Sequence, residues 1–363
     1  MPTIAEITRR VSADTMRSFM TDAFRACGLP QSDAATVAGA MLDADLSGSD
    51  AHGIFRLPGY VRALKRGHIN PRANIRVIER APATALVDGD NGMGHLVVTY
   101  AANLAVEIAR TAGTAWVGVR RSNHSGAGST YVAIPVAHGM IGMYTAVSGS
   151  NFMAPWGGAE PLLGTNPIAV GIPAGKEPPV ILDIATSVVS NGVIRTYAAE
   201  GKPMPEGWVI SREDGGPITD GRRLAEGMFM PLAGYKGSGL ALVLGLLGGP
   251  LNRAAFGRDV KDVTADQVRE TNTGHLVLAL DVARFRPLDE FTNEIDRHVR
   301  DLASSKRLPG FDEIHIPGQG RAARRGDRVK NGVPLSETLL KQVDETAKSL
   351  AIVPLSARIA SSE

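Results

Sequence analysis

The sequence predicts an α/β protein, because helical and strand-like patterns alternate along most of a long chain of ordinary composition. The chain has 363 residues, more than the ~250–300 at which single hydrophobic cores stop growing, so two or three substructures are expected. Hydrophobic residues make up 44% and charged residues 21%, as in globular proteins that bury a large core. The 41 glycines and 22 prolines indicate many tight turns between the elements.

The first half of the chain carries most of this alternation. Apolar residues recur at helical spacing over 14–27, where Gly28 and Pro30 supply a stop, and again from Ser32 to Gly48. Short apolar runs bounded by turn residues predict strands, and an Ala-rich stretch predicts a longer helix. The next expected elements are a loop over 47–52, strands at 75–79 and 85–88, a helix over 96–110, a strand at 115–119, a loop over 120–128, a helix over 131–138, and strands at 141–147, 168–172 and 180–184.

The second half is less regular. Residues 201–231 are rich in Gly, Pro and charge, which predicts a surface segment. An apolar run over 239–247 predicts a buried helix, alternating faces over 275–281 predict a strand, and 289–304 is expected to be the final helix. Basic residues crowd 321–330, where we expect a solvated, mobile loop rather than a polyanion site.

The charge balance and the single cysteine narrow the partners and the compartment. With 39 Lys and Arg against 37 Asp and Glu, the net charge of +2 gives too weak a field to hold a nucleic acid or a membrane surface. Cys27 has no partner for an internal disulfide, which favours a reducing compartment. The first thirty residues lack the apolar run of a signal peptide, and the longest apolar run, 240–247, is far shorter than the ~20 residues of a membrane span. We therefore expect a cytoplasmic protein.

Several common catalytic signatures are missing from the sequence. Gly126-Ala127-Gly128 lacks the third glycine of a Rossmann fingerprint, and no Walker-type phosphate loop occurs. The eight histidines include no pair at metal-ligand spacing on one helical turn, so no metal site is expected. Neither Ser125 nor Ser238 lies in a G-x-S-x-G elbow, which removes the simplest hydrolase interpretation.

A His-Gly loop supplies the first candidate catalytic group. His52 and Arg56 are four residues apart and can face one cavity if Gly53 opens the following helix. An imidazole that titrates near neutrality can give a proton to a carbonyl oxygen as hydride arrives, and a guanidinium can hold a carboxylate in two parallel bonds. The pair suits a 2-oxo acid, although an arbitrary His-Gly pair in a loop is more often structural.

Other polar, Gly-rich loops follow strands or open helices, where open α/β sheets place ligands. Residues 121–126 could hold a carboxylate or a cofactor amide, although taken alone a turn explains them better. Residues 165–167 and 183–187 place hydroxyls and amides at strand boundaries, which an N-cap or a turn explains equally well. Residues 234–239 open an apolar helix, so their amides and Lys236 could bind a pyrophosphate, with a flexible hinge as the alternative.

Taken in order, these strings resemble the malate/L-lactate dehydrogenase family, which also contains ureidoglycolate and sulfolactate dehydrogenases, diketogulonate reductase and piperideine-carboxylate reductase. The resemblance runs from about residue 5 to residue 350, and its motifs are weak singly but occur together in register. They are His52-Gly53 with Arg56, Asp88 to Gly92, Ser122 to His124, Pro155 to Gly158, Gly164 to Pro167, Asp183 to Ser187, Gly234 to Gly239, and Pro317 to Gln319.

The resemblance implies a fold other than the Rossmann fold. We expect a mixed, largely antiparallel sheet domain that binds NAD or NADP, beside a helical domain formed by both chain ends. The expected boundaries are 1–75 for an N-terminal helical part with the catalytic histidine loop, 76–288 for the NAD(P)-binding domain, and 289–363 for a C-terminal helical part that returns to the N-terminal one. A homodimer with active sites at the subunit boundary is also implied.

The resemblance further implies roles for single residues. His52 is the expected acid/base, Arg56 a substrate-carboxylate ligand, and Asp183 a cofactor-loop residue that also orients the histidine. In ureidoglycolate-type members the histidine that matches His124 has the proton-transfer role. We rank His52 first because the neighbouring Arg56 can bind the substrate carboxylate. The other substrate-binding candidates are Asn123 and Thr165. The cofactor-binding candidates are His124, Ser148, Asp183, Ile184, Ala185, Lys236, Gly237, Pro317, Gly318 and Gln319.

Three positions depart from the family pattern. Ala51 stands where a Ser of a hydrogen-bonded relay is common, Ser125 where the family has Phe, and Val193 where a Lys is frequent. The sequence therefore does not specify the substrate side chain, the preference between NAD and NADP, or the physiological direction.

Together these features favour a 2-oxo-acid reductase that works reversibly as a 2-hydroxy-acid dehydrogenase. The first alternative is a reductase of cyclic imines such as piperideine- or pyrroline-2-carboxylate. Arg56 would bind the carboxylate of such a substrate in the same way. The second is a catalytically silent relative that keeps the fold as a binding module. Ala51, in place of the usual relay serine, slightly favours this alternative.

Overall fold

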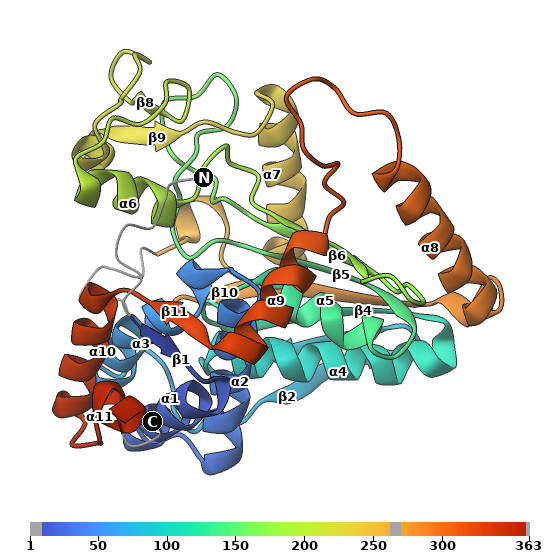
Figure 1. The fold of residues 1–363 in the computed structure, drawn as a ribbon, viewed down its shortest axis with the longest axis horizontal. Helices are drawn as coiled ribbons and strands as arrows, with labels where there is room; N and C mark the ends of the chain where they lie inside the picture. Colours follow the sequence, from blue (N-terminus) through green and yellow to red (C-terminus); the bar gives the residue numbers. More distant parts are fainter. Residues whose placement is uncertain (1–8, 262–269, 361–363) are drawn as a thin grey trace.

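A mixed β-sheet with helices on both faces forms the centre of the molecule (Figure 1). The structure is a computed structural model that describes residues 9–261 and 270–360. Within these ranges the central sheet has the order β2-β3-β4-β10-β5-β6-β7. Its strands are β2 (Arg76–Ala81), β3 (Thr84–Asp88), β4 (Thr114–Ser122), β5 (Met140–Ala146), β6 (Ile168–Ile172), β7 (Val180–Ile184) and β10 (Thr273–Asp281).

Antiparallel pairing dominates this sheet. β3 and β4 are parallel and are joined by the helix α4 (Gly94–Ala112), because parallel neighbours need a crossover connection. β10 lies between β4 and β5 and runs antiparallel to both, so that Val277 lies opposite Val117 and Tyr144. This largely antiparallel sheet confirms the fold class, including the expectation of a fold other than the Rossmann fold.

Residues that alternate along the strands separate the two faces of the sheet. Val117 and Val119 are fully buried in a core with α4 and α5 (Gly128–Val136). Gly118 points the other way, where a Cβ would lie 2.0 Å from Asn252 Oδ1. Figure 1 shows α4 and α5 on one side of the sheet and α7 (Tyr235–Gly248) on the other.

A second core lies in a helical unit built from both ends of the chain, as the resemblance implies. Its buried members include Phe19, Met41 and Leu57 from the N-terminal part and Val343 and Leu355 from the C-terminal part. The helices of this unit are α1 (Ala13–Ala26), α2 (Gln31–Leu46), α3 (Leu57–Lys65), α10 (Glu337–Ser349) and α11 (Leu355–Ala360). The two chain ends are also paired directly, because β1 (Arg9–Val11) and β11 (Val333–Leu335) form an antiparallel ladder.

The residue boundaries of the domains stay a prediction. α8 (Leu288–Ala303), which opens the expected C-terminal part, lies apart from the helical unit in Figure 1. The carboxylate of its Asp296 accepts bonds from the amides of Gly175 and Lys176 at 2.9 and 2.7 Å. α8 therefore packs beside the loop between β6 and β7, and the return to the N-terminal helices begins after it.

The segment over 201–231 is not only a surface run. It carries β8 (Val209–Ser211) and β9 (Gly227–Phe229), which pair antiparallel. With α6 (Asn191–Glu200) they enclose a third, smaller core that includes Met204 and Ile218. The remaining short 3-10 helices are η1 (Asp50–His52), η2 (Ile54–Arg56), η3 (Gly221–Glu226), η4 (Pro250–Asn252), η5 (Gly257–Asp259) and η6 (Val282–Arg284).

Two predictions for the C-terminal part are wrong. The helix predicted over 289–304 is not the final one, since α9 (Gln319–Asn331), α10 and α11 follow it. The predicted mobile loop over 321–330 is part of α9. Four of its arginines bind carboxylates and carbonyls of α2 and the following turn, although Arg324 and Arg325 stay exposed. Such long-range partners stabilise a helix whose charge pattern alone suggests a loop.

The helix predicted to be buried over 239–247 is only half buried in this chain. α7 packs Ala241, Leu244 and Gly248 inward, whereas Leu242 and Val243 are 43% and 54% exposed. Within the described ranges no helix has the length and apolar character needed to cross a bilayer.

Candidate active site

Two histidines from distant parts of the chain meet between the helical unit and the sheet. His52 ends the short helix η1, and His124 lies in the loop after β4. Their rings stack with centroids 5.6 Å apart and planes inclined by 22°. Both residues were candidates for proton transfer, so the structure brings the two competing imidazoles into one site.

Tyr60 contacts the second histidine through a hydrogen bond. Its hydroxyl lies 2.6 Å from His124 Nδ1. Tyr60 comes from α3, four residues after Arg56, so both side chains extend from the same face of the helical turn. Burial raises the pKa of the Tyr60 phenol, so the group is neutral and can donate its proton to His124 Nδ1. In that tautomer His124 Nε2 carries the proton.

His52 lacks such a partner. Its Nδ1 is buried, and no hydrogen bond to it occurs within the described residues. Nε2 is therefore the ring nitrogen that can meet a ligand. The backbone of the turn is fixed instead, because the carboxylate of Asp45 accepts the amide of Ile54 at 2.8 Å. Gly53 is required there, since a Cβ would lie 1.8 Å from Asp45 Oδ1.

Burial keeps the imidazoles of the site neutral. It lowers the pKa of His52 to about 4, with a smaller contribution from the Arg56 charge. The pKa of His124 falls well below its usual value for the same two reasons in the same order. The sequence suggested an imidazole that titrates near neutrality, whereas the enclosed position of His52 favours the uncharged ring at neutral pH.

Arg56 lies close to all of these groups. Its charge lowers the pKa of His52, His124 and also His95. Gly53 does not open a continuous helix, because η1 and η2 are separate turns and α3 begins at Leu57. The guanidinium is nevertheless directed back toward the histidine, since Arg56 Nε donates to the Ala51 carbonyl at 2.9 Å.

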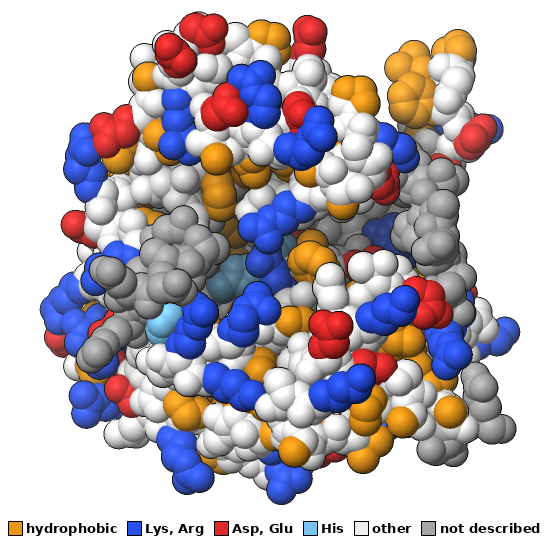
Figure 2. All heavy atoms as spheres, turned by 90° about the vertical axis from the view of Figure 1, so that its left-hand side faces the viewer, with side chains coloured by type: hydrophobic (Ala, Val, Ile, Leu, Met, Phe, Trp, Pro, Cys, Tyr) orange, Lys and Arg blue, Asp and Glu red, His pale blue; other side chains and the backbone are white. Residues whose placement is uncertain are grey.

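A pocket that contains several basic side chains lies beside this site, at Arg56. Arg56 lines this pocket with Arg62, Lys65 and Arg195, which come from α3 and α6. Figure 2 shows Lys and Arg side chains gathered around a hollow on this side of the molecule, with histidine inside the hollow. Such a surface favours an anionic ligand such as a carboxylate.

Asn123 lies next to His124, and its side chain makes hydrogen bonds that stabilise the loop. Its amide nitrogen donates to Asn91 O, Asn91 Oδ1 and Gly92 O at 3.1, 3.0 and 2.9 Å. Its side-chain oxygen accepts from Thr271 at 3.2 Å. These bonds occupy the amide that was a candidate substrate ligand and tie the His124 loop to the loop after β3.

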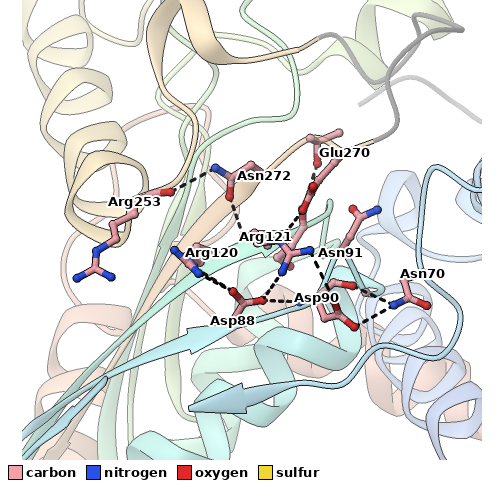
Figure 3. Close-up of polar contacts among 12 residues, drawn as sticks. Asn70, Asp88, Asp90, Asn91, Arg120, Arg121, Arg253, Glu270 and Asn272 are labelled. Atoms are coloured by element: carbon pink, nitrogen blue, oxygen red, sulfur yellow. Dashed lines mark hydrogen bonds and ion pairs between the residues drawn. The ribbon is translucent and has the colours of Figure 1, made fainter. Parts of the chain in front are cut away.

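A charged network lies beneath the His124 loop (Figure 3). The buried carboxylate of Asp88 accepts from Arg120 at 2.8 Å and from Arg121 at 3.2 Å. Arg121 also bonds Glu270 at 2.6 Å. Arg121 and Asn91 have positive φ angles of 47° and 56°, a strained conformation that persists only when surrounding contacts hold it.

Asp183, at the end of β7, points toward α5. Its Oδ2 accepts the Ser129 amide at 2.8 Å, near the positive end of that helix. Burial raises the pKa of Asp183, and the bonds from Ser129 and the charge of Arg321 oppose that rise. Within the described residues its hydrogen bonds reach α5 and not a histidine, so orientation of His52 by Asp183 has no contact to support it.

The segments that carry the cofactor candidates are joined to one another. Ser148 N donates to Asn166 Oδ1 at 3.1 Å, and Thr165 O accepts from Thr186 N at 3.0 Å. Leu232 N, just before α7, donates to Thr186 O at 2.8 Å. The loops around 148, 165 and 184–186 and the start of α7 therefore form one surface, to which Ile184, Ala185, Lys236 and Gly237 belong.

The last segment of cofactor-binding candidates, residues 317–319, joins this surface at β7. Pro317 O accepts the Ile181 amide at 3.2 Å, and Gln319 opens α9. Gly318 has a φ of +100°, and a Cβ there would lie 2.5 Å from Pro179 O, so only glycine fits. Exposed Lys236 and the free amides of the first turn of α7 suit a phosphate. Within the described ranges no three His, Cys, Asp or Glu residues could hold a metal ion.

Comparison with known proteins decides the family. The model of the malate/L-lactate dehydrogenase family matches residues 11–344. The chain belongs to this family. A malate dehydrogenase of Pyrococcus horikoshii is 36% identical over 94% of this chain and 96% of its own. The NADP(+)-dependent (2R)-3-sulfolactate dehydrogenase of Chromohalobacter salexigens is 30% identical over 94% and 99%, and the NAD(+)-dependent ureidoglycolate dehydrogenase of Escherichia coli is 28% identical over 91% and 93%.

Solved structures of this dehydrogenase family share the whole fold. The malate dehydrogenase of P. horikoshii superposes with a TM-score of 0.88 at 32% identity, covering 98% of this chain and 99% of that one. The Δ1-piperideine-2-carboxylate reductase of Pseudomonas syringae superposes with a TM-score of 0.83 at 28% identity, covering 94% and 100%. An NAD(P)-dependent oxidoreductase acting on hydroxy acids is therefore supported, and the recognition of the family from its motifs is confirmed.

Sequence reasoning missed two residues of the site. Tyr60 could have been found, because it follows Arg56 by one helical turn. His95 is 1% exposed, has no partner for either ring nitrogen within the described residues, and packs edge-on against Tyr60 at 5.2 Å. It lies in an apolar helix, where a histidine carries no local signal of function.

Proposed function

We propose that this dehydrogenase interconverts a small 2-oxo acid and the corresponding 2-hydroxy acid, with His52 as the proton-transfer residue. The observation that supports this most is that the His52 ring stacks on His124, lies near the charge of Arg56, and has no hydrogen-bond partner for Nδ1 within the described residues. An arginine holds a carboxylate in two parallel bonds. The C2 oxygen of a 2-oxo acid held in this way would lie near an imidazole that can give or take a proton.

His52 and His124 would divide the work at that oxygen. A bound nicotinamide supplies or removes the hydride at C2. In reduction His52 Nε2 would donate a proton to the C2 oxygen, and in oxidation it would take the hydroxyl proton. His124, with its Nδ1 accepting from Tyr60, would present Nε2–H as a fixed donor to the same oxygen. His124 therefore stabilises developing negative charge, and His52 is free to change protonation state.

The chain's own residues would hold a nicotinamide cofactor on the surface formed by its joined loops. Lys236 and the amides of the first turn of α7 would bind the pyrophosphate. Ser148, Ile184 and Ala185 would line the dinucleotide site, and Pro317 to Gln319 would form its boundary beside β7. The preference between NAD and NADP stays open, since both occur among the relatives.

A cyclic imine reductase is the first alternative. One structural neighbour carries the name Δ1-piperideine-2-carboxylate reductase. Arg56 could hold the ring carboxylate in the same way, and the proton would then go to nitrogen. A silent binding module is the second alternative, and the intact His52, Arg56 and His124 group argues against it.

A substrate panel tests these alternatives. Purified protein is supplied with NADH or NADPH and with open-chain 2-oxo acids, including oxaloacetate, sulfopyruvate and pyruvate, or with piperideine- and pyrroline-2-carboxylate. We expect cofactor oxidation with at least one open-chain acid. Turnover of the cyclic imines alone would reject the proposal in favour of the first alternative, and cofactor binding without any oxidation would favour the second.

We also propose that two copies of this chain form a homodimer. Apolar side chains on one face of α7 support this, because Leu242, Val243 and Leu246 are 43–54% exposed and a contiguous apolar face favours association. A cytoplasmic location stays a prediction from the sequence.

A further inference from the structure

α9 lies against the end of α2 and the turn that carries His52. Its arginines at 321, 324, 325 and 328 are spaced so that all four share one side of the helix. Arg321 and Arg325 bind the two oxygens of Asp43 at 2.6 and 2.5 Å, and Arg324 Nε donates to Ser47 O at 3.3 Å. This row of contacts follows the chain from α2 toward His52.

Arg328 is the last and most buried arginine of the row. Its Nη1 donates both to the Asp45 carbonyl and to the Asp50 carboxylate, and its Nη2 donates to Asp50 Oδ2 at 3.2 Å. Only 8% of Arg328 is exposed. The guanidinium therefore joins the two ends of the segment 45–50, which leads directly into His52.

The turn has little stability of its own. η1 is a single 3-10 turn over Asp50–His52, and such short helices depend on their surroundings. Asp45 fixes its far side through the Ile54 amide at 2.8 Å. Arg328 fixes its near side through Asp50. The backbone that carries His52 is thus held between these two contacts.

This arrangement matters for His52 because its ring stacks on His124 but has no hydrogen bond to Nδ1 within the described residues. A catalytic imidazole is usually oriented by a hydrogen bond to its second ring nitrogen. His52 Nδ1 has no such bond within the described residues, and Ala51 cannot supply the side-chain contact that a serine would. The direction of the ring therefore follows from the position of the turn.

We propose that Arg328 is a positioning residue for His52, and that it sets the turn against the segment that binds the cofactor. α9 starts at Gln319, beside the contact between Pro317 and β7. The ten residues from Gln319 to Arg328 span about 14 Å of helix, so one rigid element links the two places. This inference rests on the proposed role of His52.

Steady-state kinetics of four variants test the proposal, with the substrate found in the panel. Arg328→Ala removes the contacts to both ends of the segment 45–50. Asp50→Asn weakens one of them at a half-exposed position, where the fold tolerates change. Arg328→Lys keeps the charge. Arg325→Ala is the matched control, because it removes an ion pair of the same helix that does not touch the turn.

We expect Arg328→Ala to lower kcat by about 10–100-fold, because small displacements of a catalytic group are costly. KM and the Kd for the reduced cofactor should change less than threefold. Asp50→Asn should lower kcat by a smaller factor, Arg328→Lys should recover part of the loss, and Arg325→Ala should retain the wild-type kcat. A purely structural role predicts a lower melting temperature with unchanged kcat in the folded fraction, and that result overturns the proposal.

The contact between Arg328 and Asp50 would act as a clamp on the turn, and chemical modification tests this clamp without enzymatic turnover. Diethyl pyrocarbonate modifies accessible imidazoles, and peptide mass spectrometry measures the rate at His52. We expect this rate to rise severalfold in Arg328→Ala and Asp50→Asn and to stay unchanged in Arg325→Ala. Equal rates in all variants would overturn the clamp. If the wild-type protein oxidises no cofactor with any substrate, the proposed function fails, whereas the modification rates still decide on the clamp.

Discussion

His52 is neutral in the free enzyme because it is enclosed, and this has a direct kinetic consequence. Burial is the largest cause of its low pKa, and the nearby Arg56 charge adds to the effect. A carboxylate bound to Arg56 would offset that charge and raise the pKa of His52. The substrate would then help to load the proton that its own reduction consumes.

The pH dependence of kcat/KM should differ between the two directions. This ratio reports the free enzyme, in which His52 has a pKa of about 4. Oxidation needs the neutral ring, so its kcat/KM should be flat above about pH 5 and fall below about pH 4. Reduction needs the protonated ring, so its kcat/KM should fall roughly tenfold per pH unit from about pH 5 to pH 8. Rates in both directions across this range provide the measurement. A reduction rate that does not change with pH would exclude His52 as the acid.

At the scale of elements, the loops after β3 and β4 hold the second histidine in place. Asp88 connects Arg120, Arg121 and the Asp90 amide, and Asn123 connects the same loops next to His124. Burial opposes ionisation of Asp88, but the Asp90 amide and the two guanidiniums outweigh it and lower its pKa. The charged form of the carboxylate is therefore part of the folded structure.

Asp88→Asn should destabilise the protein by about 2–3 kcal/mol. The expected loss is smaller than for a fully buried ion pair, because the Arg120 and Arg121 side chains are 27% and 35% exposed. Glu79→Gln is the matched control, since its pair with Arg253 is about 60% exposed on both sides and should contribute less than ~1 kcal/mol. Urea unfolding measures both. A loss for Asp88→Asn no larger than that of the control would contradict the account.

Local patterns predicted the elements well where packing agrees with them. The helix expected over 14–27 is α1, and the strands expected at 168–172 and 180–184 are β6 and β7. The helix α9 was missed because its arginines find their partners on α2, far away in sequence. The sequence also named His52, Arg56 and His124 as candidates, and the structure brings them together. Their arrangement could not be read from spacing, because it depends on Tyr60, Asp45 and Arg328.

At the scale of the whole molecule, the apolar face of α7 is the surface that the second copy of the proposed dimer would cover. A helix in a globular protein normally buries its apolar face, and α7 leaves Leu242 and Val243 exposed although both are large and apolar. The apolar run over 239–247 predicts a buried helix, whereas the single chain leaves part of that helix exposed. In the proposed dimer a second copy would bury this face of α7, and the predicted burial would then be correct for the assembly.

Val243→Asp should weaken the proposed dimer, because it places a charge in an apolar contact. Sedimentation should give twice the 38.2 kDa chain mass for the wild type and a species near the chain mass for the variant. Val353→Asp, at a position with similar exposure of 56%, should leave the wild-type mass unchanged. A wild-type protein that sediments as a single chain would exclude the dimer.

Transfer of deuterium from the cofactor to the substrate tests the proposed reaction most directly. The protein is given NAD(P)H deuterated at the transferred position of C4, together with the open-chain 2-oxo acid selected in the panel, and the product is analysed by mass spectrometry. We predict a 2-hydroxy acid with one deuterium at C2. We also predict that His52→Ala forms it about 10²–10⁴-fold more slowly with little change in cofactor affinity. A product without deuterium, or a His52→Ala variant as fast as the wild type, would contradict this account.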